Sequence, residues 1–253
     1  MVPNEGSHGP PLRPDPLVTP LPPLSAPHPT VRVVHSFADL LAVPFEGECN
    51  AICWERPFTA DPSHLLHSLP TPKEVEPIDE DWLSELPSSH PGQGTARTII
   101  EDLRLLRESG HEPELNLIGA YPRDPNDDLP TDVYSFHVDS ANIPTDTFLC
   151  TYAGRPSEIL LRSEALSVPS NPALRAKLLK RHGGKDDASF LSYLEDSHQA
   201  LHYRPLPQAR PLSLGIGHLW RLAVQFPGAP VRACIHRAPP QGPQDKPRLL
   251  LIS

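Results

Sequence analysis

The sequence VYSFHVD at residues 133–139 decides the fold that we expect, because polar and apolar residues alternate along it. In a β-strand, side chains two residues apart point to the same face. His137 and Asp139 should therefore lie side by side, together with Ser135, while the intervening aromatic and aliphatic side chains cover the opposite face. An imidazole and a carboxylate in this arrangement form a two-ligand clamp for a metal ion.

A third ligand is available later in the chain. His236 lies in the strand-like sequence CIHR at residues 234–237. Two histidines and one carboxylate on one face of a metal ion leave coordination positions for a co-substrate and dioxygen on Fe(II). A His-x-Asp pair alone is weak evidence, since a chain of this composition should contain about one by chance. The alternative is that His137 and Asp139 form a hydrogen-bonded surface pair.

The order of the motifs is more specific than the pair itself. Arg248 opens a final apolar run at residues 249–252, after His236. A His-x-Asp strand, a later histidine and then an arginine at the start of the last strand are typical of oxygenases that use 2-oxoglutarate. The alternative for Arg248 is a surface arginine at the end of a strand.

Length and composition predict one catalytic domain at residues 31–253, preceded by a tail. The chain has 253 residues, of which 35 are proline, against a usual share of about 5%. Residues 1–30 are the richest in proline and should be extended and disordered. Docking of this tail to a partner is the alternative to a solvated segment.

Charge and hydropathy exclude several partners. The net charge of −9 argues against nucleic acid or an anionic membrane surface, because both require clustered Lys and Arg. The sequence contains no apolar run as long as a membrane span and no signal peptide at its start, so we expect a cytoplasmic protein that acts on a small molecule. The four cysteines have no zinc-finger spacing and should be reduced core thiols.

The apolar patterns predict a mainly β protein with peripheral helices. A period of three to four residues indicates a helix at 98–107, and capping residues predict helices that begin after Asn171 and after Asp186 or Asp187. His198 and His202, four residues apart, should be exposed on a helix. The expected strands are 30–34, 50–54, 115–120, 133–139, 147–152, 158–162, 214–216, 222–226, 231–236 and 248–252.

Several segments together resemble the DUF1826 family of bacterial and fungal proteins. They are NAICWERP (50–57), FHVD (136–139), LCTYAG (149–154), IHRAP (235–239) and RLLL (248–251), within about residues 35–253. Two departures stand out. Thr147 occupies a position where the family tends to carry arginine, and PSEIL (156–160) replaces the family's GTEWL. The chain therefore resembles a divergent member, with a substrate of its own.

The resemblance implies a double-stranded β-helix, also called a jelly-roll or cupin-like core, with an iron centre. It also implies similarity to fungal Fe(II)/2-oxoglutarate dioxygenases of secondary metabolism, which oxidise small amino acids and convert valine to an aziridine. His137, Asp139 and His236 would hold Fe(II), and Arg248 would bind the distal carboxylate of 2-oxoglutarate by a bidentate ion pair. The further candidates are Tyr152 and Thr151 for a hydroxyl contact with 2-oxoglutarate, and Arg237, Arg56 and Ser135 for the substrate.

Two other classes of function stay open. A non-catalytic, cupin-like protein of metal homeostasis would use the same three ligands without needing Arg248. A non-metal interaction module would instead dock through the proline-rich tail. For Arg56 and Arg237, a solvated or structural role is the alternative to substrate binding.

Overall fold

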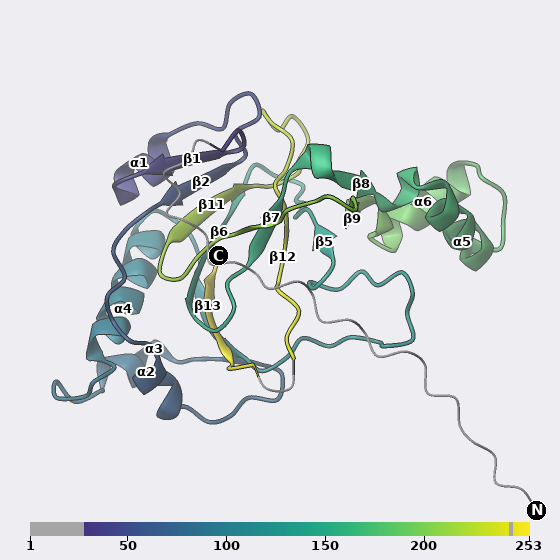
Figure 1. Ribbon diagram of the computed structural model, residues 1–253. Coiled ribbons are helices and arrows are strands. Elements are labelled where there is room, and N and C mark those ends of the chain that lie inside the picture. The colour runs from purple at the N-terminus through teal and green to yellow at the C-terminus, as the bar shows by residue number, and fades with distance from the viewer. Residues whose placement is uncertain (1–27, 243–244) are drawn as a thin grey trace, which may run out of the picture.

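The computed structural model describes residues 28–242 and 245–253, which form two β-sheets with helices around them (Figure 1). The prediction of an extended tail concerns residues 1–30, of which 1–27 lie outside the described residues. The expectation of a mainly β protein with peripheral helices is confirmed. No helix in the described ranges is long and apolar enough to cross a membrane.

The first sheet, sheet A, has seven strands. All its neighbouring strands are antiparallel except β1 and β2. In spatial order the strands are β1 (Val31–Val34), β2 (Ala51–Trp54), β11 (Leu219–Ala223), β6 (Asp146–Ala153), β13 (Arg248–Ile252), β4 (Glu114–Ile118) and β3 (Val75–Pro77).

The second sheet, sheet B, has six short strands that are antiparallel throughout. In spatial order the strands are β10 (Leu212–Ser213), β7 (Glu158–Leu160), β12 (Ile235–Arg237), β5 (Phe136–His137), β9 (His202–Pro205) and β8 (Ala165–Ser167). Strand β5 comes from the VYSFHVD segment at residues 133–139, which was expected to hold two of the metal ligands.

The helices lie in two groups (Figure 1). One group comprises α1 (Phe37–Ala42), which lies beside β1 and β2, and α2 (Ser63–His67) and α3 (Glu80–Ser84), which lie beside the long α4 (Gln93–Glu108). The other group, α5 (Pro172–His182) and α6 (Ala188–Asp196), forms a separate lobe. Three short 3-10 turns, η1 (Arg162–Glu164), η2 (Val168–Ser170) and η3 (Gln199–Leu201), complete the set. The predicted caps Asn171 and Asp187 are confirmed, since each accepts a hydrogen bond from a first-turn amide. Ser36 caps α1 in the same way.

Sheet A separates two apolar clusters. On its outer face, residues of β6 and β13 pack against α4, with Phe148, Leu249 and Leu251 among them. On its inner face, Leu149 and Leu250 join Ile159 and Cys234 of sheet B in one cluster. The space between the two sheets is therefore an apolar interior, and alternate residues of β6 and β13 face it.

Three segments differ from the sequence prediction. The expected strand 133–139 is paired only at β5, because the Val138 amide donates to the carbonyl of Leu201 in η3 rather than extending the ladder. Residues 75–77, where no strand is among those expected from the sequence, form β3, an exposed edge strand whose polar and proline residues hide the strand pattern. The expected strand at 214–216 is absent, since pairing there is confined to β10.

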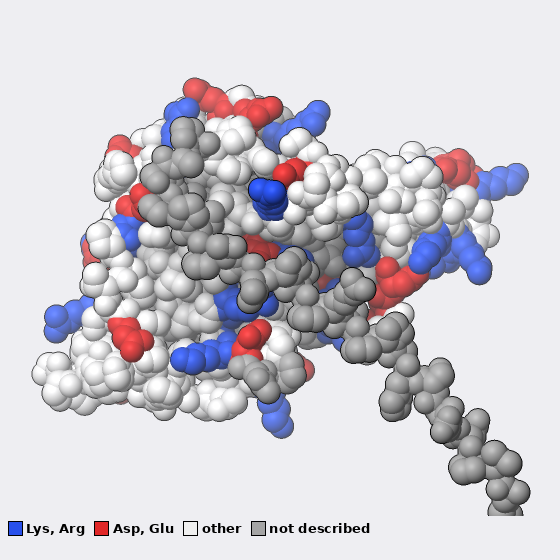
Figure 2. Space-filling view, in the orientation of Figure 1, with Lys and Arg blue, Asp and Glu red and all other residues white. Residues whose placement is uncertain are grey.

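Charged side chains of both signs alternate over the visible surface (Figure 2). On the α5 and α6 lobe, Lys177 and Arg181 form ion pairs with Asp127 and Asp128 of the long loop that precedes β5. These exposed pairs contribute little stability individually. Basic residues on this face are thus interspersed with acids instead of forming the basic patch that nucleic acid requires.

Candidate metal centre

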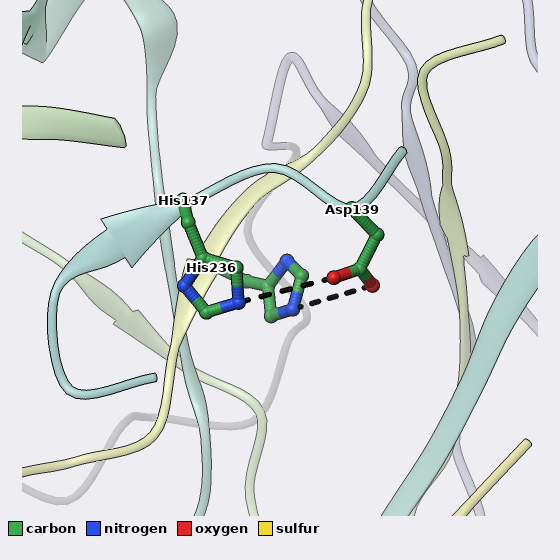
Figure 3. Close-up of side chains that lie close together, drawn as sticks. All are labelled: His137, Asp139 and His236. Carbon is green, nitrogen blue, oxygen red and sulfur yellow. Dashed lines mark ion pairs between the residues drawn. The ribbon is translucent and has the colours of Figure 1, made fainter. Parts of the chain in front are cut away.

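Two neighbouring strands of sheet B bring the three predicted ligands together. His236 of β12 lies directly opposite His137 of β5 in the antiparallel register, and Asp139 follows two residues after His137. Figure 3 shows both imidazoles directed toward the carboxylate. The Nε2 atoms of His137 and His236 lie 3.8 and 3.6 Å from the Asp139 oxygens. One donor atom from each residue falls within 4.8 Å of the others, which suits a single metal ion.

Backbone carbonyls orient both histidines. Nδ1 of His137 lies 2.8 Å from the Ser135 carbonyl, and Nδ1 of His236 lies 3.3 Å from the Cys234 carbonyl. A carbonyl can only accept a hydrogen bond, so Nδ1 carries the proton in each neutral ring. Both Nε2 lone pairs are then directed at the shared site. Metal-binding histidines are commonly oriented in this way.

Asp139 has a partner that holds one of its oxygens. The Thr147 hydroxyl, from β6 of sheet A, donates a 2.6 Å hydrogen bond to Oδ2 of Asp139. The Asp139 side chain is 34% exposed, whereas those of His137 and His236 are 15% and 10% exposed. The cluster is therefore partly open to solvent on the aspartate side.

The electrostatics favour deprotonated ligands. Burial, followed by the neighbouring charge of His236, lowers the pKa of His137 to about 4. Burial alone would raise the pKa of Asp139, but the charge of His236 and the Thr147 hydrogen bond hold it below the usual value. At neutral pH these groups are thus a neutral imidazole and a carboxylate, which are the forms that bind metal.

A further histidine lies beside the cluster. His202 of β9 is opposite His137 in the register, and their rings stack with centroids 5.6 Å apart. The sequence prediction of a helix through His198 and His202 is wrong, because His198 adopts a left-handed backbone conformation and His202 begins a strand. His202 belongs to no metal-sized group among the described residues, so we assign it to packing against His137.

Arg248 is fully buried at the start of β13. Its Nε donates to the Arg155 carbonyl at 2.8 Å, Nη2 donates to the Ser157 hydroxyl at 2.8 Å, and Nη1 lies 3.5 Å from the Tyr121 hydroxyl. All three partners are neutral acceptors. Within the described ranges, no carboxylate lies within 4.0 Å of this guanidinium. Burial lowers the pKa of Arg248, which expresses the cost of an uncompensated charge.

Arg248 and the histidine cluster face the same interior. Along β13, Arg248 shares a face with Leu250, and along β12, His236 shares a face with Cys234. Leu250 and Cys234 belong to the single cluster between the sheets. The buried arginine thus lies on the sheet opposite the ligands and borders the same interior. The alternative of a surface arginine is inconsistent with its complete burial.

Thr151 and Gly154 form the wall beside Arg248. Thr151 pairs with Leu250 on the inner side of sheet A, and its buried hydroxyl has no hydrogen-bond partner among the described residues. Gly154 follows β6 with φ +78°, and a Cβ there would lie 2.8 Å from Cα and 2.9 Å from Cγ of Arg248. Glycine is therefore required for the close approach of this turn to Arg248.

Tyr152 and Arg56, which the sequence assigned to 2-oxoglutarate and substrate, belong to a different network. Both bind Asp102 of α4: the Tyr152 hydroxyl donates a 2.6 Å hydrogen bond to Oδ2, and the Arg56 guanidinium forms a two-pronged ion pair. Tyr152 lies in the outer cluster of sheet A, away from the interior. The structure therefore places these residues where they anchor α4, and not at the ligand cluster.

Arg237 and Ser135, the other substrate candidates, are also engaged elsewhere. Arg237 points to the opposite side of β12 from His236, where it pairs with Glu158 and stacks over the Phe136 ring. The Ser135 hydroxyl is buried and donates to the Pro130 carbonyl at 3.2 Å. Of the Ser135 atoms, it is the backbone carbonyl that contributes to the site, by orienting His137.

Sequence reasoning missed three residues that support the site. They are Thr147, Ser157 and Tyr121, which contact Asp139 and Arg248. For Thr147 a signal existed, since it is an inward-facing residue of a strand otherwise rich in apolar residues. Ser157 and Tyr121 lie in connecting segments, where no periodicity reveals the direction of a side chain.

Comparisons with known proteins add no relative. No protein-family model, no curated protein and no solved structure matches this chain. The functional conclusion must therefore be drawn from the site itself.

Proposed function

We propose that the protein is a non-haem Fe(II) oxygenase that uses 2-oxoglutarate and dioxygen to oxidise a small molecule, with small amino acids such as valine as the first substrates to test. The observation that carries the proposal is the buried guanidinium of Arg248, which has no carboxylate within 4.0 Å among the described residues and borders the same interior as a His-Asp-His cluster. A buried arginine without a carboxylate partner is costly, and a carboxylate ligand would offset that cost.

The donor set fits Fe(II). Two neutral imidazoles and one carboxylate are the ligands of the facial triad found in non-haem iron oxygenases. His137 and His236 would each bind through Nε2, and Asp139 through an oxygen, while Thr147 keeps its hydrogen bond to Oδ2. When bound, the iron together with 2-oxoglutarate would supply the activation of dioxygen needed to oxidise a C–H bond.

The other residues of the chain would bind, orient and exclude water. Arg248 would bind a carboxylate of 2-oxoglutarate with its two-pronged geometry, which matches a carboxylate better than a lysine does. The Thr151 hydroxyl, which has no partner among the described residues, is available to donate to the same carboxylate. Trp220 and Ile159, both fully buried in the cluster between the sheets, would keep water from the interior.

The fold and the cell compartment are part of the proposal. Two facing sheets of mostly antiparallel strands are in keeping with a double-stranded β-helix, as in the DUF1826-like reading of the sequence. Four buried free cysteines are in keeping with the reducing conditions of the cytoplasm. The chain would then be a divergent, cytoplasmic member of the DUF1826 family that acts in secondary metabolism.

Anaerobic addition of Fe(II) and 2-oxoglutarate tests the proposal directly. Chelation of iron by 2-oxoglutarate should give a visible charge-transfer band in the wild type, a lost band in His236→Ala and a much weaker band in Arg248→Met. Admission of dioxygen with valine or another small amino acid should then produce succinate. Iron binding without any band would favour a non-catalytic protein of metal homeostasis, and the absence of metal binding would overturn both interpretations.

A further inference from the structure

A cavity lies where β7 ends and where the chain leads into β12, and the metal ligands do not line it. It has a volume of about 530 Å³ and is lined by the residues that follow β7, the segment that leads into β12 and the loop before β2. His137, Asp139 and His236 are not among its lining residues. Its polar walls are formed by Arg162, Arg232, Asn50 and Glu48.

Arg162 is held in place by neutral groups only. Its Nη1 donates to the Tyr203 hydroxyl at 3.0 Å, its Nη2 donates to the Ala233 carbonyl at 3.0 Å, and Cζ lies 5.2 Å from the centre of the Tyr203 ring. Its Nε is buried without a hydrogen-bond partner in the described part of the chain. These contacts fix the guanidinium but do not neutralise it, since no described carboxylate lies within 4.0 Å.

Arg232 adds a second positive charge to the same cavity. The amide of Asn50 fixes its backbone by donating to the carbonyls of Arg232 and Ala233 at 3.2 and 3.4 Å. Its own guanidinium forms no ion pair with a described residue. Glu48 is the one acid among the lining residues, and it lies more than 4.0 Å from both guanidinium groups. The cavity thus carries an excess of positive charge in a chain whose net charge is −9.

The remaining walls are mostly apolar, apart from the hydroxyl residues Thr30 and Ser163. Leu161, Pro29, Pro230 and Val231 line the cavity beside the two arginines. A pocket that combines a few fixed polar groups with an apolar wall is typical of small-molecule sites. The fixed guanidinium selects for an acid, because its parallel N–H groups match a carboxylate or a phosphate.

We propose that this cavity is a binding site for a small organic anion with an apolar body, in which Arg162 and Arg232 bind the acid group. The site is independent of the proposed oxygenase function, because none of the metal ligands lines it. Arg162 would be the main contact, since it is already oriented, and Arg232 would add attraction from a more exposed position.

Ligand-observed saturation-transfer NMR on the full chain tests the site, with hexanoate and hexan-1-ol as the observed probes. Inorganic phosphate, which has no carbon-bound proton to observe, is tested by whether it displaces hexanoate. Hexanoate should bind with a dissociation constant in the millimolar range, as expected for so few atoms. Phosphate should bind more weakly than hexanoate because it lacks the apolar body. Hexan-1-ol should not bind measurably because it lacks the acid group. Binding of hexan-1-ol as tight as hexanoate would overturn the role of the arginines.

Variants locate the anion. Arg162→Gln should weaken hexanoate binding by about 10-fold or more, and Arg232→Gln by a few-fold, in line with the loss of charge-assisted hydrogen bonds. Arg97→Gln, which removes the same charge from an exposed position on α4, is the matched control and should change nothing. Arg232→Gln removes no side-chain hydrogen bond or ion pair among the described residues, and so remains informative if Arg162→Gln unfolds.

The test of the anion site can fail or succeed independently of the test of the metal centre. His236→Ala, which removes a proposed iron ligand, should leave hexanoate binding intact. The proposal fails if the folded wild type gives no saturable signal with hexanoate up to roughly 20 mM, a limit above the millimolar affinity expected for this probe. It also fails if the Arg162→Gln and Arg232→Gln double variant still binds as the wild type does.

Discussion

Thr147 donates a 2.6 Å hydrogen bond to Oδ2 of Asp139, and this bond joins sheet A to the ligand strand of sheet B. One carboxylate oxygen is thereby held before any metal binds. Thr147→Val keeps the volume but removes the donor, so metal affinity should fall about 10- to 100-fold, the usual cost of losing an outer hydrogen bond. Thr147→Ser should restore most of it. Titration with Zn²⁺ measured by calorimetry checks both variants.

The three ligands should be individually necessary for metal binding. His137→Ala, Asp139→Ala and His236→Ala each leave two donors, too few to hold Fe(II) against water. We expect loss of bound metal, measured by elemental analysis after dialysis, with far-UV circular dichroism unchanged. His202→Asn is the control, because His202 stacks on His137 without belonging to the cluster. Full metal content in all three alanine variants would rule out the site.

Removal of the Arg248 charge should leave the stability of the protein unchanged or slightly higher, but it should weaken the binding of 2-oxoglutarate. Because the guanidinium is buried without an acid partner in the described part of the chain, Arg248→Met should leave the metal-free protein about as stable as the wild type or slightly more so. Affinity for 2-oxoglutarate should fall roughly 30-fold or more, as for a buried charge pair that loses one partner, and Arg248→Lys should fall between the two. Thermal unfolding with Mn²⁺, with and without 2-oxoglutarate, measures both effects. If 2-oxoglutarate raised the melting temperature of the wild type and of Arg248→Met equally, Arg248 would have no role in binding the co-substrate.

The metal-free protein should lose stability in mild acid. The pKa of His137 is lowered to about 4 in the folded protein from 6.5 in the unfolded chain, so the unfolded state takes up this proton first as the pH falls. Stability should therefore decrease between pH 6.5 and 4, by on the order of 2–3 kcal/mol in full. The low pKa of Asp139 acts only below its ordinary value of 3.8. Urea unfolding from pH 7 to 4.5 should show a shallower decline in His137→Gln.

The network of Arg56, Asp102 and Tyr152 should affect stability and not catalysis. Asp102→Asn breaks a buried pair and should cost about 3–5 kcal/mol, whereas Tyr152→Phe should cost about 1 kcal/mol. Neither change should alter the apparent KM for 2-oxoglutarate, because both side chains lie on the outer face of sheet A. A KM raised tenfold in Tyr152→Phe would instead return Tyr152 to the co-substrate site.

The ligand cluster could be predicted from the sequence because two of its ligands lie two residues apart on one segment, and the third is the one histidine of another strand-like segment. The two-residue period places His137 and Asp139 on one face, and His236 is the histidine of the strand-like CIHR segment. The register that sets His236 opposite His137 is a tertiary property and does not follow from either segment.

Side-chain direction explains the residues that the sequence assigned differently. Tyr152 and Thr151 are adjacent in β6 and therefore face opposite sides of sheet A, and only the sheet's position shows which side holds the ligands. Arg237 follows His236 directly and is directed away from it for the same reason. The sequence alone does not distinguish a structural arginine from one that is available to bind an anion. The structure does, because Arg56 forms an ion pair with an acid, whereas no acid partner of Arg248 is found among the described residues.

The turn at Gly154 gives a way to recognise chains that share this centre. Any side chain at this position would strike the backbone and side chain of Arg248 at 2.8 to 2.9 Å, so a buried arginine here requires a residue without a Cβ as its neighbour. Glycine five residues after the start of a Leu-Cys-Thr-Tyr run is thus coupled by steric exclusion to an arginine almost a hundred residues later in the chain. A sequence that retains His137, Asp139 and His236 but has alanine in place of Gly154 would have to displace the arginine, and it would then lack the carboxylate-binding group that we propose for Arg248.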